Sequence, residues 1–261
     1  MTARLQALED SLGQRLVNRQ KSGAVPTAAG LRLRRYAEAM SGLWDQARQE
    51  VALPADVRVI CNLGCDSDLW TGAGTDLFAV LQEHQPDIAV SIWGGSPAEI
   101  AGWMESGLVD ISLGYAPPAT TSQTAIRLAD EILVLVSPQA DRPMTFDPQY
   151  VFVEAGRDFA REHAAAYANA GTGNIGFNRA EWALSHLLDK GGSAYLPKRL
   201  AAPLVADGTL FELADAPVFK QPVYLLVNDA TTQAWTWLDA AMQDAKGRIG
   251  IFLSGNGAKI Q

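Results

Sequence analysis

The chain has 261 residues, of which 48% are hydrophobic, and a formal net charge of −8 at pH 7. This composition is typical of a folded globular protein and excludes a disordered chain. No apolar run reaches the roughly 18 residues of a membrane span, and residues 1–20 are charged where a secretory signal is apolar. We therefore expect a cytoplasmic protein that does not enter a membrane.

Cysteine and histidine are few in this chain. Cys61, Cys65 and the three histidines lack the spacing of a zinc site, so we expect no structural metal. Cys61 lies in the apolar run VRVICNL and is expected to be buried. Cys65 is expected in a loop just before a helix, where a thiolate can be stabilised. A redox role for the pair stays open.

Positive charge is concentrated near the beginning of the chain. Residues 1–36 hold seven Lys or Arg and two acidic residues, so the remaining residues carry a surplus of thirteen negative charges. This distribution favours a small basic unit that approaches a polyanion, attached to a large acidic body. A solvated, Arg-rich helix surface would give the same pattern.

The N-terminal segment predicts a helix, a two-stranded ribbon and a second helix. Leu5, Leu8 and Leu12 recur at helical spacing, and Gly13 suits the left-handed conformation that ends a helix. RLVNRQKSGAVPT then alternates around a Lys-Ser-Gly tip, as a hairpin or wing does. Thr27 can cap the helix that follows.

The helix expected in residues 27–52 carries an apolar stripe with alternating steps of four and three residues. Its members are Leu33, Ala37, Met40, Trp44, Ala47 and Val51. This is the spacing of a coiled-coil seam, which favours pairing with a copy of the same helix. Packing on the body of the same chain is the alternative. LPAD at 53–56 breaks the helix and marks a domain boundary.

After residue 56, short β-branched runs alternate with helical segments. VRVICNL, TDLFAVLQEHQPD, IAVSIWG, SPAEIAGWMESG and VDISLG predict strand, helix, strand, helix and strand, and so a parallel sheet. YVFVEAG, IGFN and GGSAYLP indicate a second α/β set. EILVLVS and PVYLLVND, at 131–137 and 222–229, are predicted to pass between the sets. We expect two α/β lobes with a double hinge and a ligand cleft, lobe I from about 57–133 and 229–261 and lobe II from about 134–228.

Loops beyond the carboxyl ends of the strands supply the candidate ligand-binding residues, because helix N-termini point unpaired N–H groups there. They are Cys65, Asp66, Ser67, Ser96 and Tyr115 from lobe I, and Glu154, Arg157 and Asn178 from lobe II. Each has a structural alternative. Asp66, Ser67 and Ser96 can be helix caps, worth about 1 kcal/mol each. Tyr115 can belong to the core.

The cleft has no convincing catalytic set. Asp66 and Asp68 resemble a carboxylate pair, but the histidines that could serve Cys65 as a base lie in or near helical segments, away from the loops. No phosphate-binding glycine loop or hydrolase elbow is present in the sequence. Binding without catalysis or a cofactor is the better interpretation. Asp66 and Asp68 suit an amine or hydroxyl-rich ligand, whereas Arg157 and Arg179 suit an anion, so the ligand class stays open.

TARLQALEDSLGQRLVNRQKSGAVPTAAGLRLRRYA resembles the later part of the winged helix-turn-helix of LysR-type transcriptional regulators. The matching positions are Thr2, Leu5, Leu8, Glu9, Leu12, Gly13, Leu16, Val17, Arg19 and Thr27–Gly30. ESGLVDISLG and DKGGSAYLPKRL are similar to segments of that family's effector-binding region. The resemblance therefore extends over nearly the whole chain.

The resemblance implies an α/β fold with three parts. They are a partial winged helix-turn-helix in residues 1–26, a long linker and dimerisation helix in residues 27–52, and a two-lobed, periplasmic-binding-protein-like (type 2) effector domain in residues 57–261. It also implies a homodimer or homotetramer that binds operator DNA and a small-molecule effector. Thr2, Arg4, Arg19 and Lys21 are the expected DNA contacts. The rival is a solute-binding module or enzyme of the same two-lobed fold that acts without DNA.

Several positions depart from the family pattern. Pro26 stands where the family usually has Leu, Val17 replaces Phe, and SPQADRPM replaces a His-Pro-Leu turn. The family's first two winged-motif helices have no counterpart before Met1, so we expect a start site further upstream. A helix of about 12 residues is marginal without such partners. We therefore expect the chain as given to lack specific operator binding.

Overall fold

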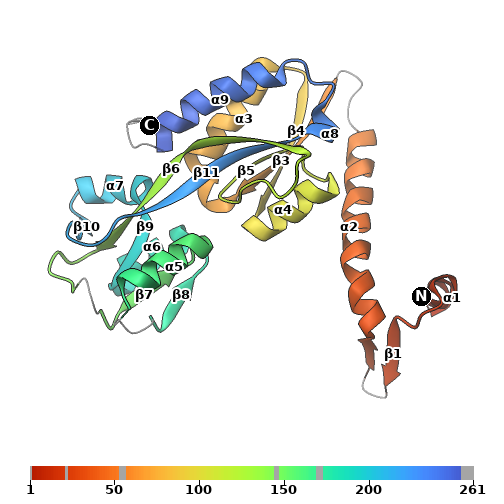
Figure 1. Ribbon diagram of the computed structural model, residues 1–261, viewed down its shortest axis with the longest axis horizontal. Coiled ribbons are helices and arrows are strands. Elements are labelled where there is room, and N and C mark those ends of the chain that lie inside the picture. The colour runs from red at the N-terminus through yellow and green to blue at the C-terminus, as the bar shows by residue number, and fades with distance from the viewer. Residues whose placement is uncertain (1, 21–22, 53–56, 144–146, 169–172, 254–261) are drawn as a thin grey trace. The chain divides into compact units, whose positions relative to one another are not determined.

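The computed structural model describes residues 2–20, 23–52, 57–143, 147–168 and 173–253. Contacts within the chain divide it into two units, Met1–Ala55 and Asp56–Gln261, which we call unit 1 and unit 2. Unit 1 contains helices and a small hairpin, and unit 2 is built on one large sheet (Figure 1). Among the described helices, none has both the length and the apolar composition needed to cross a membrane.

Unit 1 has the predicted helix, ribbon and second helix. Helix α1 (Thr2–Leu12) ends at Gly13, whose φ is 63°. Strands β1 (Val17–Gln20) and β2 (Gly23–Pro26) pair in antiparallel fashion. Oγ1 of Thr27 accepts a 3.0 Å hydrogen bond from the backbone N–H of Gly30 and so caps α2 (Ala28–Val51). These three predictions are confirmed.

The start of α2 packs closely against the segment before the hairpin. The backbone N–H of Thr27 donates to the carbonyl of Leu16 over 2.9 Å, and Leu16 is buried. A Cβ atom at position 30 would overlap that same carbonyl oxygen. Because only glycine leaves room for this approach, Gly30 is required where the helix meets the hairpin.

Among the described residues of unit 2, nine strands form one sheet, in the order β4-β3-β5-β11-β6-β9-β7-β8 with β10 paired to β6. The strands are β3 (Val59–Asp66), β4 (Ile88–Gly95), β5 (Ile111–Gly114), β6 (Gln123–Ser137), β7 (Tyr150–Val153), β8 (Ile175–Phe177), β9 (Ser193–Pro197), β10 (Phe211–Glu212) and β11 (Phe219–Asn228). β3 is parallel to β4 and β5, and β7 is parallel to β8 and β9. Both predicted parallel sets are therefore confirmed.

Two long antiparallel strands, β6 and β11, connect these sets (Figure 1). Their register runs from the pair Phe219 and Leu133 to the pair Asn228 and Gln123, with a shift between Val223 and Tyr224. β11 also pairs with β5, whereas β6 pairs with β9. We call the part around β3, β4 and β5 lobe I and the part around β7, β8 and β9 lobe II. The predicted double crossing between two lobes is confirmed.

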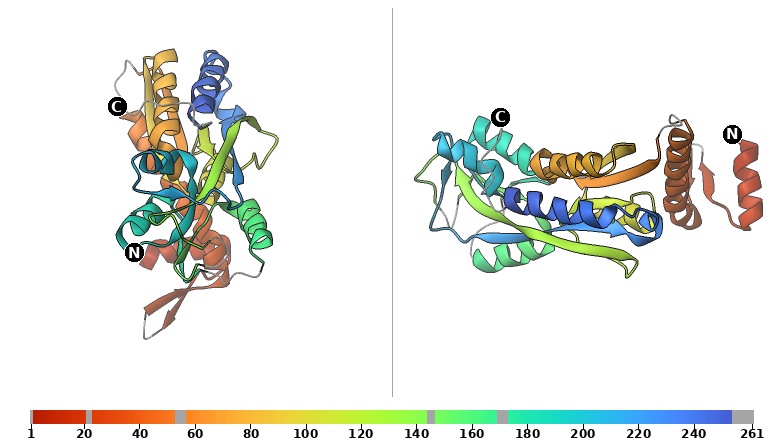
Figure 2. Two further views of the ribbon diagram at one scale, coloured as in Figure 1. Left: turned by 90° about the vertical axis from the view of Figure 1, so that its left-hand side faces the viewer. Right: turned by 90° about the horizontal axis from the view of Figure 1, so that it is seen from above.

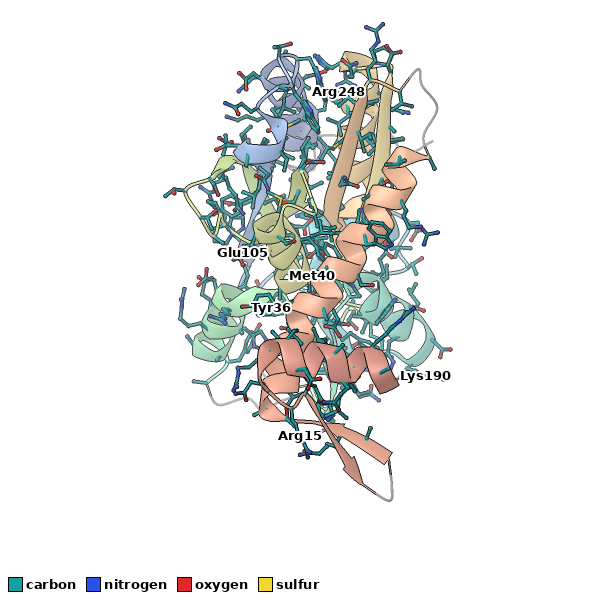
Figure 3. The ribbon with its side chains drawn as sticks, turned by 90° about the vertical axis from the view of Figure 1, so that its right-hand side faces the viewer. Arg15, Tyr36, Met40, Glu105, Lys190 and Arg248 are labelled. Carbon is teal, nitrogen blue, oxygen red and sulfur yellow. The ribbon has the colours of Figure 1, made fainter. Side chains whose placement is uncertain are left out.

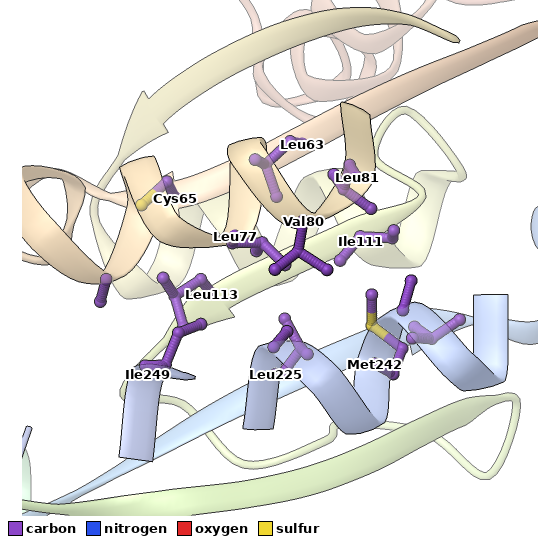
Figure 4. Packing of buried hydrophobic residues seen from close by; sticks show 14 of the residues in the cluster. Leu63, Cys65, Leu77, Val80, Leu81, Ile111, Leu113, Leu225, Met242 and Ile249 are labelled. Atoms are coloured by element: carbon purple, nitrogen blue, oxygen red, sulfur yellow. The ribbon is translucent and has the colours of Figure 1, made fainter. Parts of the chain in front are cut away.

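Helices cover the sheet of unit 2. They are α3 (Thr75–His84), α4 (Pro97–Ser106), α5 (Gly156–Ala166), α6 (Ala180–Lys190), α7 (Lys198–Ala206), α8 (Asp229–Thr232) and α9 (Leu238–Leu253), with the short turns η1 (Ser67–Leu69) and η2 (Trp70–Gly74). α3 and α9 lie side by side (Figure 2). Leu77 and Val80 of α3 meet Met242 and Ile249 of α9 in the core of lobe I (Figure 4). These residues recur at helical spacing, so each helix buries one face.

The core of lobe II lies on both faces of its sheet. Leu187 of α6 and Leu196 of β9 belong to one buried cluster, and Phe159 of α5 and Tyr195 of β9 belong to another. Every residue of β9 is buried. A strand covered on both faces has a continuous apolar run rather than an alternating one, which explains the sequence SAYLP.

Candidate functional site

An ionic cluster joins the two lobes beyond the carboxyl end of β3. We call it the interlobe cluster, and its members are Asp66, Asp68, Tyr115 and Glu131 together with Arg179 and Arg199. Asp66 ends β3, Asp68 lies in η1, and Tyr115 follows β5. Arg179 and Arg199 belong to lobe II, at the beginnings of α6 and α7.

Asp66 and Arg179 form an ion pair between the lobes. Nη1 of Arg179 lies 3.2 Å from Oδ1 of Asp66, and the two side chains are 18% and 4% exposed. Asp66 also caps η1, because the same oxygen accepts a 3.1 Å hydrogen bond from the backbone N–H of Asp68. The carboxylate therefore serves both lobes.

Asp68 makes two further contacts with lobe II. Its Oδ2 accepts a 3.2 Å hydrogen bond from the backbone N–H of Ala180, the first residue of α6. Its backbone carbonyl accepts a 2.5 Å hydrogen bond from Nη2 of Arg199. A carboxylate at a helix N-terminus is stabilised by the unpaired N–H groups and by the helix dipole.

Glu131 lies at the centre of the cluster, in β6. Arg199 donates from Nε to one of its carboxylate oxygens, and the hydroxyl of Tyr115 donates to the other over 2.5 Å. The side chain of Glu131 is 2% exposed and that of Arg199 is 10% exposed. Both oxygens of a buried carboxylate are thus paired, as burial of a charge requires.

The cluster holds three carboxylates and two guanidinium groups, so it has a surplus of negative charge when fully ionised. Burial raises the pKa of Asp66 from 3.8 to about 6, and the charge of Asp68 adds to this rise, while Arg179 opposes it. Burial also raises the pKa of Asp68. The pKa of Tyr115 is raised by burial and by the charge of Glu131. The burial of these three groups therefore favours their neutral forms.

Two of the predicted ligand-binding residues, Asp66 and Tyr115, meet in the cluster. Ser67 lies beside it as the first residue of η1. Ser96 caps α4: its hydroxyl accepts from the backbone N–H of Glu99, and the Glu99 carboxylate accepts from the backbone N–H of Ser96 over 2.8 Å. The same carboxylate also accepts from the Ser96 hydroxyl over 2.7 Å, and the two hydrogen bonds that it accepts lower the pKa of Glu99, which the charge of Arg179 lowers further. The start of α4 is therefore within electrostatic reach of the cluster.

The prediction that Cys65 lies in a loop is wrong. β3 continues through Cys65 to Asp66, where it pairs with Gly95 of β4, so the side chain of Cys65 lies in the core of lobe I (Figure 4). It is 1% exposed, and burial raises its thiol pKa to about 12. A buried, protonated thiol is poorly suited to contact a ligand or to react. Among the described residues, no His, Cys, Asp or Glu group is arranged to hold a metal.

The other predicted residues of lobe II are exposed. Glu154 follows β7, Arg157 lies in the first turn of α5, and Asn178 follows β8. The interlobe cluster does not include them. Arg179, the neighbour of Asn178, faces lobe I instead.

Glu131 and Arg199 were missed by the sequence reasoning. Glu131 opens the apolar run EILVLVS, and a charged residue beside such a run is a signal for a buried ion pair. Arg199 follows the segment AYLP at the beginning of a helix, where the strand-end rule applied to the other loops would have found it.

The predicted DNA contacts belong to α1 and the hairpin of unit 1. Arg4 is exposed on α1. Thr2 and Arg19 are part of α1 and β1, but their side chains lie outside the described residues, as does the whole of Lys21.

The apolar stripe of α2 is exposed except at Leu33, which is half-buried. Met40, Trp44 and Val51 are 59%, 66% and 88% exposed, respectively. Tyr36 and Met40 project from the same helix in Figure 3. A row of large exposed apolar side chains of this kind marks an interaction surface.

Comparisons with known proteins agree with this architecture. A profile of the LysR substrate binding domain matches residues 60–243. The HTH-type transcriptional regulator HdfR of Salmonella typhimurium is 24% identical over 226 residues, which cover 85% of this chain and 80% of that protein.

Solved structures have the same fold. DarR of Vibrio fischeri, in complex with DNA, has a TM-score of 0.62 at 16% identity, covering 94% of this chain and 87% of its own. ArgP of Mycobacterium tuberculosis has a TM-score of 0.59 at 17% identity, covering 95% and 86%. Because the profile matches more than half of the residues, the chain belongs to the LysR family and carries the substrate binding domain of that family.

Proposed function

We propose that the chain is a cytoplasmic transcriptional regulator that binds a small-molecule effector between lobes I and II. The observation that carries this proposal is the interlobe cluster, in which Asp66 and Asp68 meet Arg179 and the beginning of α6. Convergent charged groups beyond the carboxyl ends of strands are where open α/β sheets bind ligands.

Effector binding acts through the relative position of the two lobes. The lobes are connected by the Asp66–Arg179 ion pair and by the Asp68–Ala180 hydrogen bond. A ligand that takes over these partners has a different affinity for each arrangement of the lobes, and this difference sets how far the equilibrium moves. A ligand with equal affinity for both arrangements would change nothing.

The groups of the site support binding rather than catalysis. The carboxylate of Glu131 is held by Arg199 and Tyr115, and the thiol of Cys65 is buried. The relatives named as HTH-type transcriptional regulators favour a regulator over a solute-binding module or an enzyme of the same fold. We accordingly infer that the protein has no catalytic activity.

In this proposal the basic side chains of unit 1 attract DNA without specific operator binding by the chain as given, and unit 1 also supplies the dimer contact. Arg4 on α1 and the basic hairpin face the nucleic acid, and the exposed stripe of α2 pairs with a second copy of the chain. DarR, a relative in fold, is described in complex with DNA. The contact with DNA is expected to weaken as salt rises, because it depends on basic side chains.

A thermal-shift screen of the whole chain with small acids, amines and amino acids tests the effector site. A ligand at about 100 times its dissociation constant adds roughly 2.7 kcal/mol to the free energy of unfolding. The double variant Asp66→Asn, Arg179→Gln replaces both charged groups by neutral amides, and we expect it to lose the stabilisation. Arg161→Gln, at an exposed ion pair of α5, is the matched control. Equal stabilisation of the double variant by the same ligand would place the site elsewhere.

A further inference from the structure

We infer that the effector is an amino-acid-like zwitterion, with its ammonium group toward lobe I and its carboxylate group toward lobe II. The inference rests on the proposed function, because it assumes that the ligand lies between the lobes at the interlobe cluster. It follows from the unequal charges that the two lobes present to each other.

The wall formed by lobe I is acidic. Asp66 and Asp68 both point their carboxylates at lobe II, over 3.2 Å in each case. Glu99, on the first turn of α4, is close enough for the charge of Arg179 to lower its pKa, after the larger effect of its hydrogen bonds with Ser96. A ligand that separates the lobes here meets carboxylates on this side.

The wall formed by lobe II is positive. It consists of the guanidinium of Arg179 and the N-terminus of α6, where the backbone N–H of Ala180 is directed at Asp68. α6 has 11 residues, long enough for its terminus to favour an anion. The carboxylates of lobe I already occupy this wall, which indicates the kind of group that it accepts.

The remaining pair of charges in the cluster, Glu131 and Arg199, needs no ligand to be neutralised. Arg199 is paired with Glu131, whose second oxygen accepts from Tyr115. This group is neutral as a unit and buried between the lobes. The choice of ligand therefore depends on the two walls alone.

A ligand of one charge sign leaves one wall without its partner. A dicarboxylate replaces Asp66 and Asp68 at Arg179 and Ala180, but it leaves both carboxylates buried beside further negative charge. A diamine leaves Arg179 unpaired in the same way. Removing the partner of a buried charge costs several kcal/mol. A zwitterion replaces both partners at once, because its ammonium takes the place of Arg179 and its carboxylate takes the place of the aspartates.

Isothermal titration of the whole chain with three classes of ligand tests this inference. The classes are amino acids with the amine in α or ω position, diamines, and dicarboxylates, each with four, five and six carbons. We expect an amino acid to bind at least about tenfold more tightly than the diamine and the dicarboxylate of its length. Arg179→Gln should weaken amino acid binding by about tenfold to a hundredfold, since a hydrogen bond to a charged group is lost.

The two walls can be separated by a pair of variants. Arg179→Gln should bring the diamine closer to the amino acid in affinity, whereas Asp68→Asn should do so for the dicarboxylate. Asp68→Asn keeps an oxygen for the N–H of Ala180, and unfolding midpoints verify that both variants are folded. Arg161→Gln and Asp189→Asn, at exposed ion pairs of lobe II, are the controls and should change neither preference.

The outcomes distinguish this inference from the proposed function. Tightest binding of a diamine that Asp68→Asn weakens, or of a dicarboxylate that Arg179→Gln weakens, overturns the zwitterion and leaves the effector site in place. Absence of binding by every amino acid also overturns the zwitterion. The thermal-shift screen with Asp66→Asn, Arg179→Gln then decides separately whether the effector site lies in the cluster.

Discussion

Arg199 of α7 is paired with Glu131 of β6, and its guanidinium also donates to the backbone carbonyl of Asp68 in lobe I. Because the pair is almost fully buried, each charge depends on the other. We expect Arg199→Met to lower the free energy of unfolding by about 3–5 kcal/mol, as removal of one buried partner does. Urea unfolding measures this change.

A second variant separates the loss of the pair from the loss of packing. When Glu131→Gln is added to Arg199→Met, no buried charge is left without a partner, so we expect much of the lost stability to return. A double variant as unstable as the sum of the two single ones would show that the charges do not act as a pair.

The ionisation of Asp66 makes stability depend on pH. The folded protein holds the Asp66 proton more tightly than the unfolded chain, because the pKa is about 6 in the fold and 3.8 in its absence. This group therefore lowers the free energy of unfolding as the pH rises from about 4 to about 6, and the contribution is fully favourable only below that range.

Asp66→Asn removes this dependence. Between pH 5 and pH 7.5 we expect the wild type to lose about 1 kcal/mol relative to the variant. Urea unfolding of both proteins at the two pH values gives the difference, and other titrating groups cancel in the comparison. A constant difference would mean that Asp66 is ionised throughout this range.

Gly72 and Gly208 are two positions of positive φ that differ in the space around them. Both have positive φ, 88° and 80°, but a Cβ at Gly72 would overlap the ring of Phe252, whereas at Gly208 nothing lies within 4 Å. Gly208→Ala should cost about 1–2 kcal/mol, because an L-residue is strained there. Gly72→Ala should cost an additional 1–3 kcal/mol or so from overpacking. Thermal unfolding of the two variants provides the comparison, and equal losses would rule out the contact with Phe252.

The stripe of α2 predicts the effect of a charge on self-association. Trp44 is 66% exposed, and a glutamate in its place would have to be buried in a helix pair. We expect Trp44→Glu to shift the chain from dimer to monomer in light scattering. The unfolding of unit 2 should not change. Glu38→Gln, in an exposed pair with Arg34 on the same helix, is the control. A variant that remains dimeric would place the dimer contact elsewhere.

Local patterns were enough to predict most of the elements. Gly13 and Thr27 mark the ends of two helices, and each does so through its own backbone conformation or hydroxyl. The alternation of strands and helices likewise predicted both parallel sets, because each element depends on the periodicity of its own residues.

The partners within the site depend on topology and could not be predicted from local pattern. Asp66 lies 113 residues from Arg179, and Glu131 lies 68 residues from Arg199. No periodicity connects such positions, and only the double crossing of the chain brings them together. The predicted loop position of Cys65 was wrong for a more local reason. The pairing with β4 extends the strand as far as Asp66, beyond the apolar run VRVICNL from which the strand was predicted.

The ladder between β6 and β11 weakens at one level. Pro222, which has no N–H to donate, lies opposite Asp130, and the register shifts between Val223 and Tyr224. Gln221, one residue earlier, faces Glu131. We therefore expect the lobes to bend at this level of the ribbon, where a ladder hydrogen bond is missing and the register shifts. Glu131 lies one residue from Asp130 on the same strand, so its buried pair with Arg199 fastens lobe II close to the level where such a bend would occur.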